Sequence, residues 1–332
     1  MEDRGGEDEF IGRGVLLHTM DGGRLWEIVG GTNFDAGEGT FSCFFEKWKE
    51  VGPMSSIVVK KVPQPDGEIV TKGWIASRDG VYFATNASDS IGAWRRITPR
   101  PDEPDCYSSF MGIHSGLDLD REIYAFGWQG IAHWATGGKW EIQLKTHQFY
   151  ISQVRAYGVN YRDAWAVSQG TGDAGLRSRD QDHGALFHLD WPGTNWVQTP
   201  LTGIDFSPLQ GLTDIIKLRN SETLLIVGQH GMIIRGSMEG ATRVWKTVPS
   251  HTKQDLLSIT YDANLNLWIA GDFGIILQSH DDGETWTDVA SHDEHGSGIT
   301  DHLNRVVFCD NNQGWIVGNN IVLKYEPPRD NH

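Results

Sequence analysis

Two carboxylates have the setting that acid and base catalysis requires. Asp79 and Asp272 each come close after a short apolar strand, so both side chains would lie at strand ends. Glycoside hydrolysis uses two carboxyl groups, one as acid and one as nucleophile or base, and they can come from loops far apart in the sequence. Asp79 and Asp272 are therefore the first catalytic pair to test for a carbohydrate-active hydrolase or lyase.

A second possible chemistry is metal binding at His292-x-x-His295, where Asp293 and Glu294 lie between the imidazoles. Imidazole and carboxylate are usual ligands of zinc. Two histidines at this spacing share a face only on a helical turn, and the glycines that follow favour an irregular loop instead. We therefore expect a solvated acidic loop with no metal at His292 and His295.

The remaining motifs of enzyme chemistry are missing from the sequence. The three cysteines have no Cys-x-x-Cys spacing, so neither a disulfide framework nor a structural zinc site is indicated. Nothing matches a nucleophile elbow, a phosphate-binding loop or a dinucleotide fingerprint. The sequence predicts no cofactor, and a protein without catalytic activity is favoured over an enzyme.

The segment Ser279-His-Asp-Asp-Gly-Glu-Thr-Trp286 has the spacing Ser-x-Asp-x-Gly-x-Thr-Trp, which describes one kind of hairpin turn. In it a short Asp side chain accepts backbone N–H bonds, Gly takes a positive φ and the aromatic ring packs back over the hairpin. A second copy runs from Thr19 through Asp21 and Gly23 to Trp26. Recurrence of such a turn indicates a repeat protein.

A short apolar strand that ends in a small residue recurs seven times, at intervals of roughly 40 to 65 residues. The copies are 10–12, 73–77, 123–127, 164–168, 224–228, 267–271 and 314–318. Each is followed by a turn and a second apolar strand, six continue to a Trp that opens an outer strand, and most are preceded by an innermost strand. Each repeat thus has four strands, A to D from the inside outwards.

This pattern predicts an all-β fold, a seven-bladed β-propeller of four-stranded antiparallel blades. One domain would cover residues 1–332, with disordered ends at 1–8 and 327–332. The amino end supplies strands B, C and D of one blade, and the carboxyl end supplies A, B and C of another. The alternative is six blades with one blade shared by the two ends.

In such a propeller the B–C turns and the D–A connections lie on one face, here called the B–C face, and the Asp-containing C–D turns lie on the other. We therefore expect Asp21, Asp281 and Asp282 to be structural. The B–C turns mix aromatic rings, amides and charges, as a polar-ligand pocket does. The predicted ligand-binding residues are Arg13, Arg78, Trp128, Gln129, Arg177, Asp182, His183, His230, Asp272 and Phe273.

The turn pattern resembles the Asp-box, or BNR, repeat. The copy from Gly271 to Trp286, and Asn304-Arg-Val-Val-Phe308 followed by Gly314-Trp-Ile-Val-Gly318, are similar to propellers of the photosystem II assembly and stability factor family. The resemblance implies a binding or assembly propeller without catalytic activity. The middle repeats replace the box with segments such as Thr136-Gly-Gly-Lys-Trp140, so a photosynthetic role is not carried over.

Sialidases share the Asp-box, but they carry an Arg-Ile-Pro motif near their first strand. The nearest segment here, Arg96-Ile-Thr-Pro99, follows an outer-strand Trp, which argues against a sialidase.

The amino-acid composition limits the classes of molecule that this protein is expected to bind. The net charge of −16 would repel phosphate backbones and anionic lipids, so we expect no nucleic acid and no membrane insertion. The acidic start lacks the features of a secretion signal, so we expect a cytoplasmic protein. The expected partner is a protein or a small polar ligand such as a glycan.

Overall fold

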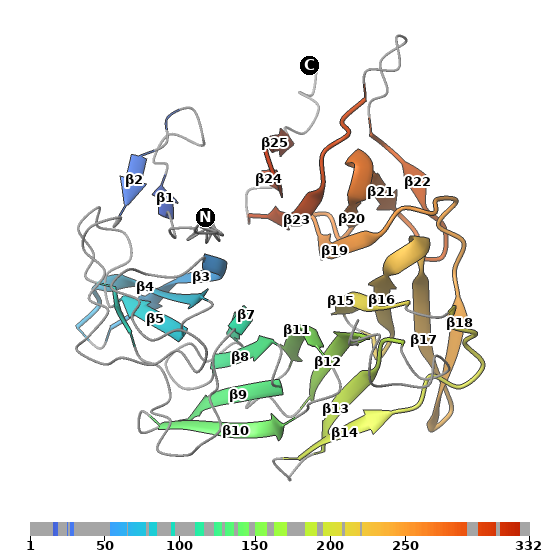
Figure 1. Ribbon diagram of the computed structural model, residues 1–332, viewed down its shortest axis with the longest axis horizontal. Helices are drawn as coiled ribbons and strands as arrows, with labels where there is room; N and C mark the ends of the chain where they lie inside the picture. The colour runs from blue at the N-terminus through green and yellow to red at the C-terminus, as the bar shows by residue number, and fades with distance from the viewer. Residues whose placement is uncertain are drawn as a thin grey trace, which may run out of the picture. The chain divides into compact units, whose positions relative to one another are not determined.

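The computed structural model describes residues 16–18, 25, 27–29, 54–64, 66–77, 80–84, 94–96, 110–115, 123–127, 130–135, 139–145, 150–157, 163–170, 183–190, 195–207, 210–219, 221–290, 298–309 and 313–325. They lie in two compact units, residues 1–145 and 146–332. Both units are built of antiparallel β-sheets (Figure 1). None of the helices found among these residues has the length and hydropathy needed to cross a bilayer.

The described residues of the first unit form three sheets. Strands β1 (Leu16–His18) and β2 (Glu27–Val29) form a two-stranded sheet. The second sheet has the order β3 (Met54–Pro63), β4 (Ile69–Ser77), β5 (Gly80–Ala84) and β6 (Arg95–Arg96). The third has the order β7 (Phe110–Ser115), β8 (Ile123–Gly127), β9 (Gly130–Ala135) and β10 (Lys139–Lys145).

In the part of the second unit that the structure describes there are four sheets, three with four strands and one with three. The first is β11 (Tyr150–Tyr157), β12 (Asp163–Gln169), β13 (Leu186–Asp190) and β14 (Asn195–Thr199). The second is β15 (Leu212–Lys217), β16 (Leu224–Gly228), β17 (Ile233–Glu239) and β18 (Thr242–Thr247). The third is β19 (Leu256–Tyr261), β20 (Leu267–Gly271), β21 (Ile276–Ser279) and β22 (Thr287–Asp288), and the fourth is β23 (Leu303–Phe308), β24 (Gly314–Gly318) and β25 (Val322–Tyr325).

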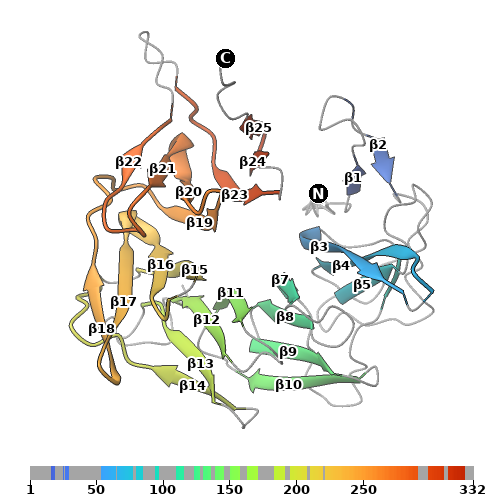
Figure 2. The same cartoon turned by 180° about the vertical axis from the view of Figure 1, so that it is seen from behind.

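Within the second unit, the first strands β11, β15, β19 and β23 lie side by side, and β14, β18 and β22 lie on the outer side (Figure 2). This is the A-to-D blade order that the sequence predicts, and the all-β propeller prediction is confirmed. Six of the seven predicted B strands coincide with β4, β8, β12, β16, β20 and β24. The seven-bladed prediction also needs a B strand at 10–12, which lies outside the described residues, as do the termini 1–8 and 327–332.

The B strands are apolar at almost every position because both of their faces are covered. In β16, Leu224 and Ile226 pack in a cluster with Trp165 of the preceding sheet. Leu225 and Val227 pack in another cluster with Ile259 of the following sheet. Alternate residues of one strand thus join two neighbouring blades, so the described sheets of this unit share their hydrophobic cores.

Candidate functional site

Two B–C turns of the second unit have the same unusual backbone. They are the short 3-10 turns η2 (Gln229–Gly231) and η3 (Asp272–Gly274). In each, the middle residue is left-handed although it is not Gly: His230 has φ 56° and Phe273 has φ 54°. This conformation is rare for residues of such size, and strain of this kind is characteristic of functional sites.

Each of these turns is hydrogen-bonded to the D–A connection that precedes its sheet. The Gln229 N–H donates to the Gly211 carbonyl, and the Asp272 N–H donates to the Asp255 carbonyl. The third turn repeats the contact, with the Asn319 N–H donating to the His302 carbonyl. The B–C face of this unit is therefore a set of turns and connections held in place by backbone bonds.

The turn at Phe273 carries an exposed aromatic ring beside a carboxylate–imidazole pair. The Phe273 side chain is 59% exposed and its ring lies 5.8 Å from the ring of His302. His302 Nδ1 lies 2.6 Å from Asp272 Oδ1, and this hydrogen bond together with the carboxylate charge raises the pKa of His302. The Asp272 carboxylate is thus hydrogen-bonded to His302, and this contact argues against Asp272 as a free catalytic base.

His183 makes two contacts that hold its ring in place. Its ring stacks on Phe206 with centroids 4.6 Å apart and planes at 10°, and its Nδ1 lies 2.8 Å from the Gly184 carbonyl oxygen. Phe206 belongs to the D–A connection after β14. His183 therefore fastens that connection to the segment that leads into β13.

Of the residues predicted from the sequence, His183, His230, Asp272 and Phe273 lie in the part of the chain that the structure describes. The others lie outside it: Arg13, Arg78, Asp79, Trp128, Gln129, Arg177, Asp182, His292 and His295.

The Asp-box lies at the other end of the C strand from these turns, since η3 precedes β21 and the box follows it. Asp281 Oδ1 accepts bonds from the Ser279 hydroxyl at 2.8 Å and from the Thr285 N–H at 2.9 Å. The carbonyl of Asp282 accepts a bond from Arg235 of the preceding sheet at 2.8 Å. These contacts agree with the expectation that Asp281 and Asp282 are structural.

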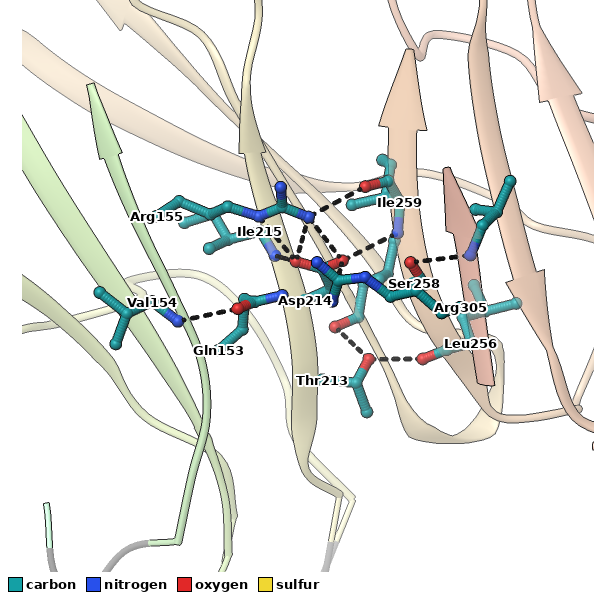
Figure 3. A network of polar contacts seen from close by, with 12 residues as sticks. Gln153, Val154, Arg155, Thr213, Asp214, Ile215, Leu256, Ser258, Ile259 and Arg305 are labelled. Carbon is teal, nitrogen blue, oxygen red and sulfur yellow. Dashed lines mark hydrogen bonds and ion pairs between the residues drawn. The ribbon is translucent and has the colours of Figure 1, made fainter. Parts of the chain in front are cut away.

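Sequence reasoning missed a charged cluster on the inner strands, formed by Arg155 of β11, Asp214 of β15 and Arg305 of β23 (Figure 3). Arg155 donates from Nη2 to Asp214 Oδ2 at 3.1 Å and from Nε to Oδ1 at 3.3 Å. Backbone N–H groups of Ile215 and Ile259 donate to the same carboxylate at 2.8 and 3.1 Å. Asp214 is 1% exposed and its oxygens are well supplied with donors.

The ionisation state of Asp214 follows from these contacts. Burial alone would raise the pKa of its carboxyl, but the charge of Arg155 and the hydrogen bonds outweigh burial and lower it. Asp214 is therefore a permanent anion that balances one of the two neighbouring arginines.

Arg305 is the second arginine, and its guanidinium lies farther from the Asp214 carboxylate than that of Arg155. Its Nη1 lies 3.9 Å from Asp214 Oδ2, beyond hydrogen-bond distance, and its side chain is 46% exposed. It lies three residues after His302, so the cluster begins close beneath the B–C face. Two guanidinium groups around one saturated carboxylate leave one positive charge whose N–H donors can bind an oxyanion.

A repeated β-bulge sets these positions. All six described inner strands skip one residue near their start, at Ser55, Met111, Ser152, Thr213, Leu257 and Asn304. The skip leaves Asp214 and Arg305 at corresponding places, directly after the bulge. A signal existed in the sequence, since Leu-Thr-Asp214 and Leu-Asn-Arg305 occupy the same repeat position, but only strand register shows that they meet.

Comparison with known proteins finds similarity to one family over part of the chain. The family model described as "Photosynthesis system II assembly factor YCF48" matches residues 216–326. This match covers about a third of the chain. This stretch includes both η turns, the Asp-box and Arg305.

Curated relatives of this family match short parts of the chain. The photosystem II assembly lipoprotein Ycf48 of Synechocystis sp. is 36% identical over 73 residues, which are 22% of this chain and 20% of that protein. The photosystem II stability/assembly factor HCF136 of Arabidopsis thaliana is 28% identical over 104 residues, 31% of this chain and 24% of that protein. The chain thus spans between a fifth and a quarter of the length of these relatives.

Solved structures match the fold over nearly the whole chain. A structure described as YCF48 bound to D1 peptide has a TM-score of 0.62 at 17% identity, covering 95% of this chain and 89% of that one. YCF48 from Cyanidioschyzon merolae has a TM-score of 0.60 at 16% identity, with the same two coverages. At such identity the likeness establishes the propeller fold.

Proposed function

We propose that this protein is a binding module without catalytic activity, which holds a segment of a protein partner on the B–C face during assembly of a complex. The observation that carries the proposal is Arg305, whose half-exposed guanidinium lies next to a saturated carboxylate just below that face. An acidic group of the partner would accept hydrogen bonds from the N–H groups of Arg305 that do not bond to Asp214. The similar structure described as bound to D1 peptide supports a protein partner for this chain as well.

The exposed turn at Phe273 suits the same function. A large ring held on a strained, hydrogen-bonded turn loses little entropy on binding, because its backbone is already ordered. Aromatic and Arg side chains dominate the energy of protein interfaces. Phe273 and Arg305 would therefore act as the apolar and the charged anchor of the partner segment.

The test uses affinity capture of partners from extracts of the source cells, with the wild-type chain and two variants. We expect Arg305→Gln and Phe273→Gly each to lose a captured protein, whereas Lys246→Gln retains it, because Lys246 lies on the outer strand β18 with its side chain 67% exposed. Binding of the recovered partner is then measured by calorimetry. Equal affinity of wild type and both variants would refute the proposed face.

A further inference from the structure

The residue directly before each of the inner strands β15, β19 and β23 occupies the same place in the repeat. Its three occupants are Gly211, Asp255 and His302, and the backbone carbonyl of each accepts a bond from the first residue of a B–C turn. The backbone at this place is thus alike in the three repeats. Only the side chain differs: Gly211 has none, Asp255 has a carboxylate and His302 has an imidazole.

The side chain at this place contacts the B–C turn of the preceding sheet. Asp255 Oδ1 accepts a bond from the His230 N–H of η2 at 2.8 Å. One repeat later His302 stands where Asp255 stood, and its ring contacts the side chain of Asp272 in η3. A group that is negative at the first boundary is therefore replaced at the second by a group that can be positive.

The tautomer of His302 follows from its contact with Asp272. A carboxylate can only accept hydrogen bonds, so His302 Nδ1, which lies 2.6 Å from Asp272 Oδ1, carries a hydrogen in both ionisation states. Nε2 is then the nitrogen that gains and loses the proton. It accepts hydrogen bonds when the ring is neutral and donates one when the ring is charged.

Two carboxylates act on the ionisation of His302. The hydrogen bond from Asp272, the charge of Asp272 and the charge of Asp301 raise the pKa of the imidazole. The oxygens of Asp301 already accept backbone N–H bonds from His302 and Asn320, each at 2.8 Å. Asp301 therefore acts on the ring through its charge, whereas Asp272 holds it directly. The His302 side chain is 48% exposed, so its proton exchanges with solvent.

We propose that His302 is a further binding residue of the B–C face, which donates from Nε2 to a carboxylate of the partner segment only when the imidazole is protonated. The inference rests on the proposed function, in which Phe273 and Arg305 hold an acidic segment. The rings of Phe273 and His302 lie 5.8 Å apart, so a segment that covers Phe273 also meets His302. Loss of the proton removes the donor and leaves the charge of Asp272 unbalanced, and the acidic segment is released.

The probe is a short synthetic peptide of glutamates around one central leucine, with both ends blocked, added to the full chain. Its carboxylates stay ionised above about pH 6, so a change in pH above that value acts on the protein and not on the peptide. Fluorescence anisotropy measures its affinity. We expect the affinity to fall about threefold to fivefold between about pH 6 and pH 8.5, as for one exposed ion pair.

The sign follows from linkage. Binding of an anion next to His302 raises the pKa of the imidazole further, so its contribution to affinity is complete below the pKa of the peptide-free protein. The contribution is lost as the pH rises through the pKa of the complex. NMR of the His302 ring, assigned by its absence in His302→Gln, follows this titration directly, and we expect a higher pKa with peptide than without it.

Three variants separate the causes. His302→Gln should bind at low pH as weakly as wild type binds at high pH, and with the same affinity throughout. Asp272→Asn should move the fall in affinity to lower pH, because the carboxylate that favours the charged ring is gone. His280→Gln is the matched control on the Asp-box, where Nδ1 lies 2.7 Å from Asn266 Oδ1, and it should keep the full pH dependence.

Several results would overturn the inference. Equal affinity of the wild type at both ends of the pH range would refute the role of His302 and leave the proposed function intact. Unchanged pH dependence in His302→Gln, or an equal His302 pKa with and without peptide, would do the same. Failure of the peptide to bind at any pH would refute both proposals. A glutamine peptide with the same leucine that binds as tightly as the acidic one would show that no carboxylate is recognised.

Discussion

At the scale of single residues, hydroxyl groups join neighbouring blades. The Ser152 Oγ donates to Leu212 of the next inner strand at 2.6 Å, and Thr213 Oγ1 donates to Leu256 in the same way. Ser55 Oγ reaches Phe110 at 3.1 Å in the first unit. Each hydroxyl comes from the skipped residue of a bulge, so the bulge turns a surface side chain into a contact between blades.

We expect Thr213→Val to lower the free energy of unfolding by about 1 to 2 kcal/mol, because it keeps the shape of the side chain and leaves the buried Leu256 carbonyl short of a donor. Thr213→Ser retains the hydroxyl and should lose less than half as much. Urea denaturation of the three proteins measures the difference, and equal losses would show that the hydroxyl contributes nothing.

Asp163 makes stability depend on pH in the acid range. Burial by itself would raise the pKa of its carboxyl. Hydrogen bonds from His188, Lys217 and Trp165 outweigh burial and lower the pKa to about 2. Since the folded pKa is below the unfolded value of 3.8, its contribution is complete above pH 3.8 and is lost as pH falls through about 2. Unfolding free energy should drop by about 2 kcal/mol over this interval in wild type and by clearly less in Asp163→Asn.

At the scale of elements, the η3 turn has two consecutive left-handed residues, Phe273 and Gly274. Gly274 adopts this conformation without strain, whereas Phe273 does not. A Cβ on Gly274, which has φ +73°, would lie 1.8 Å from the Ile299 carbonyl oxygen. The ring of Phe273 precedes it at an equally left-handed position. A turn that avoids strain would have Gly or Asn at Phe273.

Gly274→Ala should therefore cost more than about 2 kcal/mol of unfolding free energy, since the backbone of both partners must move. Phe273→Gly should leave stability unchanged or raise it by up to about 1 kcal/mol, because relief of strain offsets the added chain entropy. Thermal unfolding of both variants checks this. A large loss of stability in Phe273→Gly would assign the ring to the core instead of to binding.

At the scale of the molecule, Asp214 couples the inner strands of the second unit. Its carboxylate contacts residues of β11, β15 and β19 and lies near Arg305 of β23. Its removal would leave two arginines close together without their anion.

We expect Asp214→Asn to lower the free energy of unfolding by about 3 kcal/mol. The double variant Arg155→Met with Asp214→Leu should recover part of this loss, because the buried guanidinium is removed together with its anion and only the half-exposed Arg305 stays charged. Calorimetry of both proteins provides the test, and an additive loss in the double variant would contradict the account.

The sequence by itself determined what depends on short segments. The apolar run of each B strand, the Gly and Trp positions and the box at Ser279 identified the propeller and the order of strands within each blade, because each pattern is completed within a few residues. The same local patterns placed His230, Asp272 and Phe273 correctly on B–C turns.

Only the tertiary structure decided which side chains meet between blades. Arg155 and Asp214 are 59 residues apart, and their contact depends on a bulge that shifts the register of each inner strand by one residue. A one-residue slip would turn both side chains to other faces, so no local pattern could reveal the pair. The structure likewise showed that Asp272 is bound by His302, because this contact depends on how separate segments of the chain pack together.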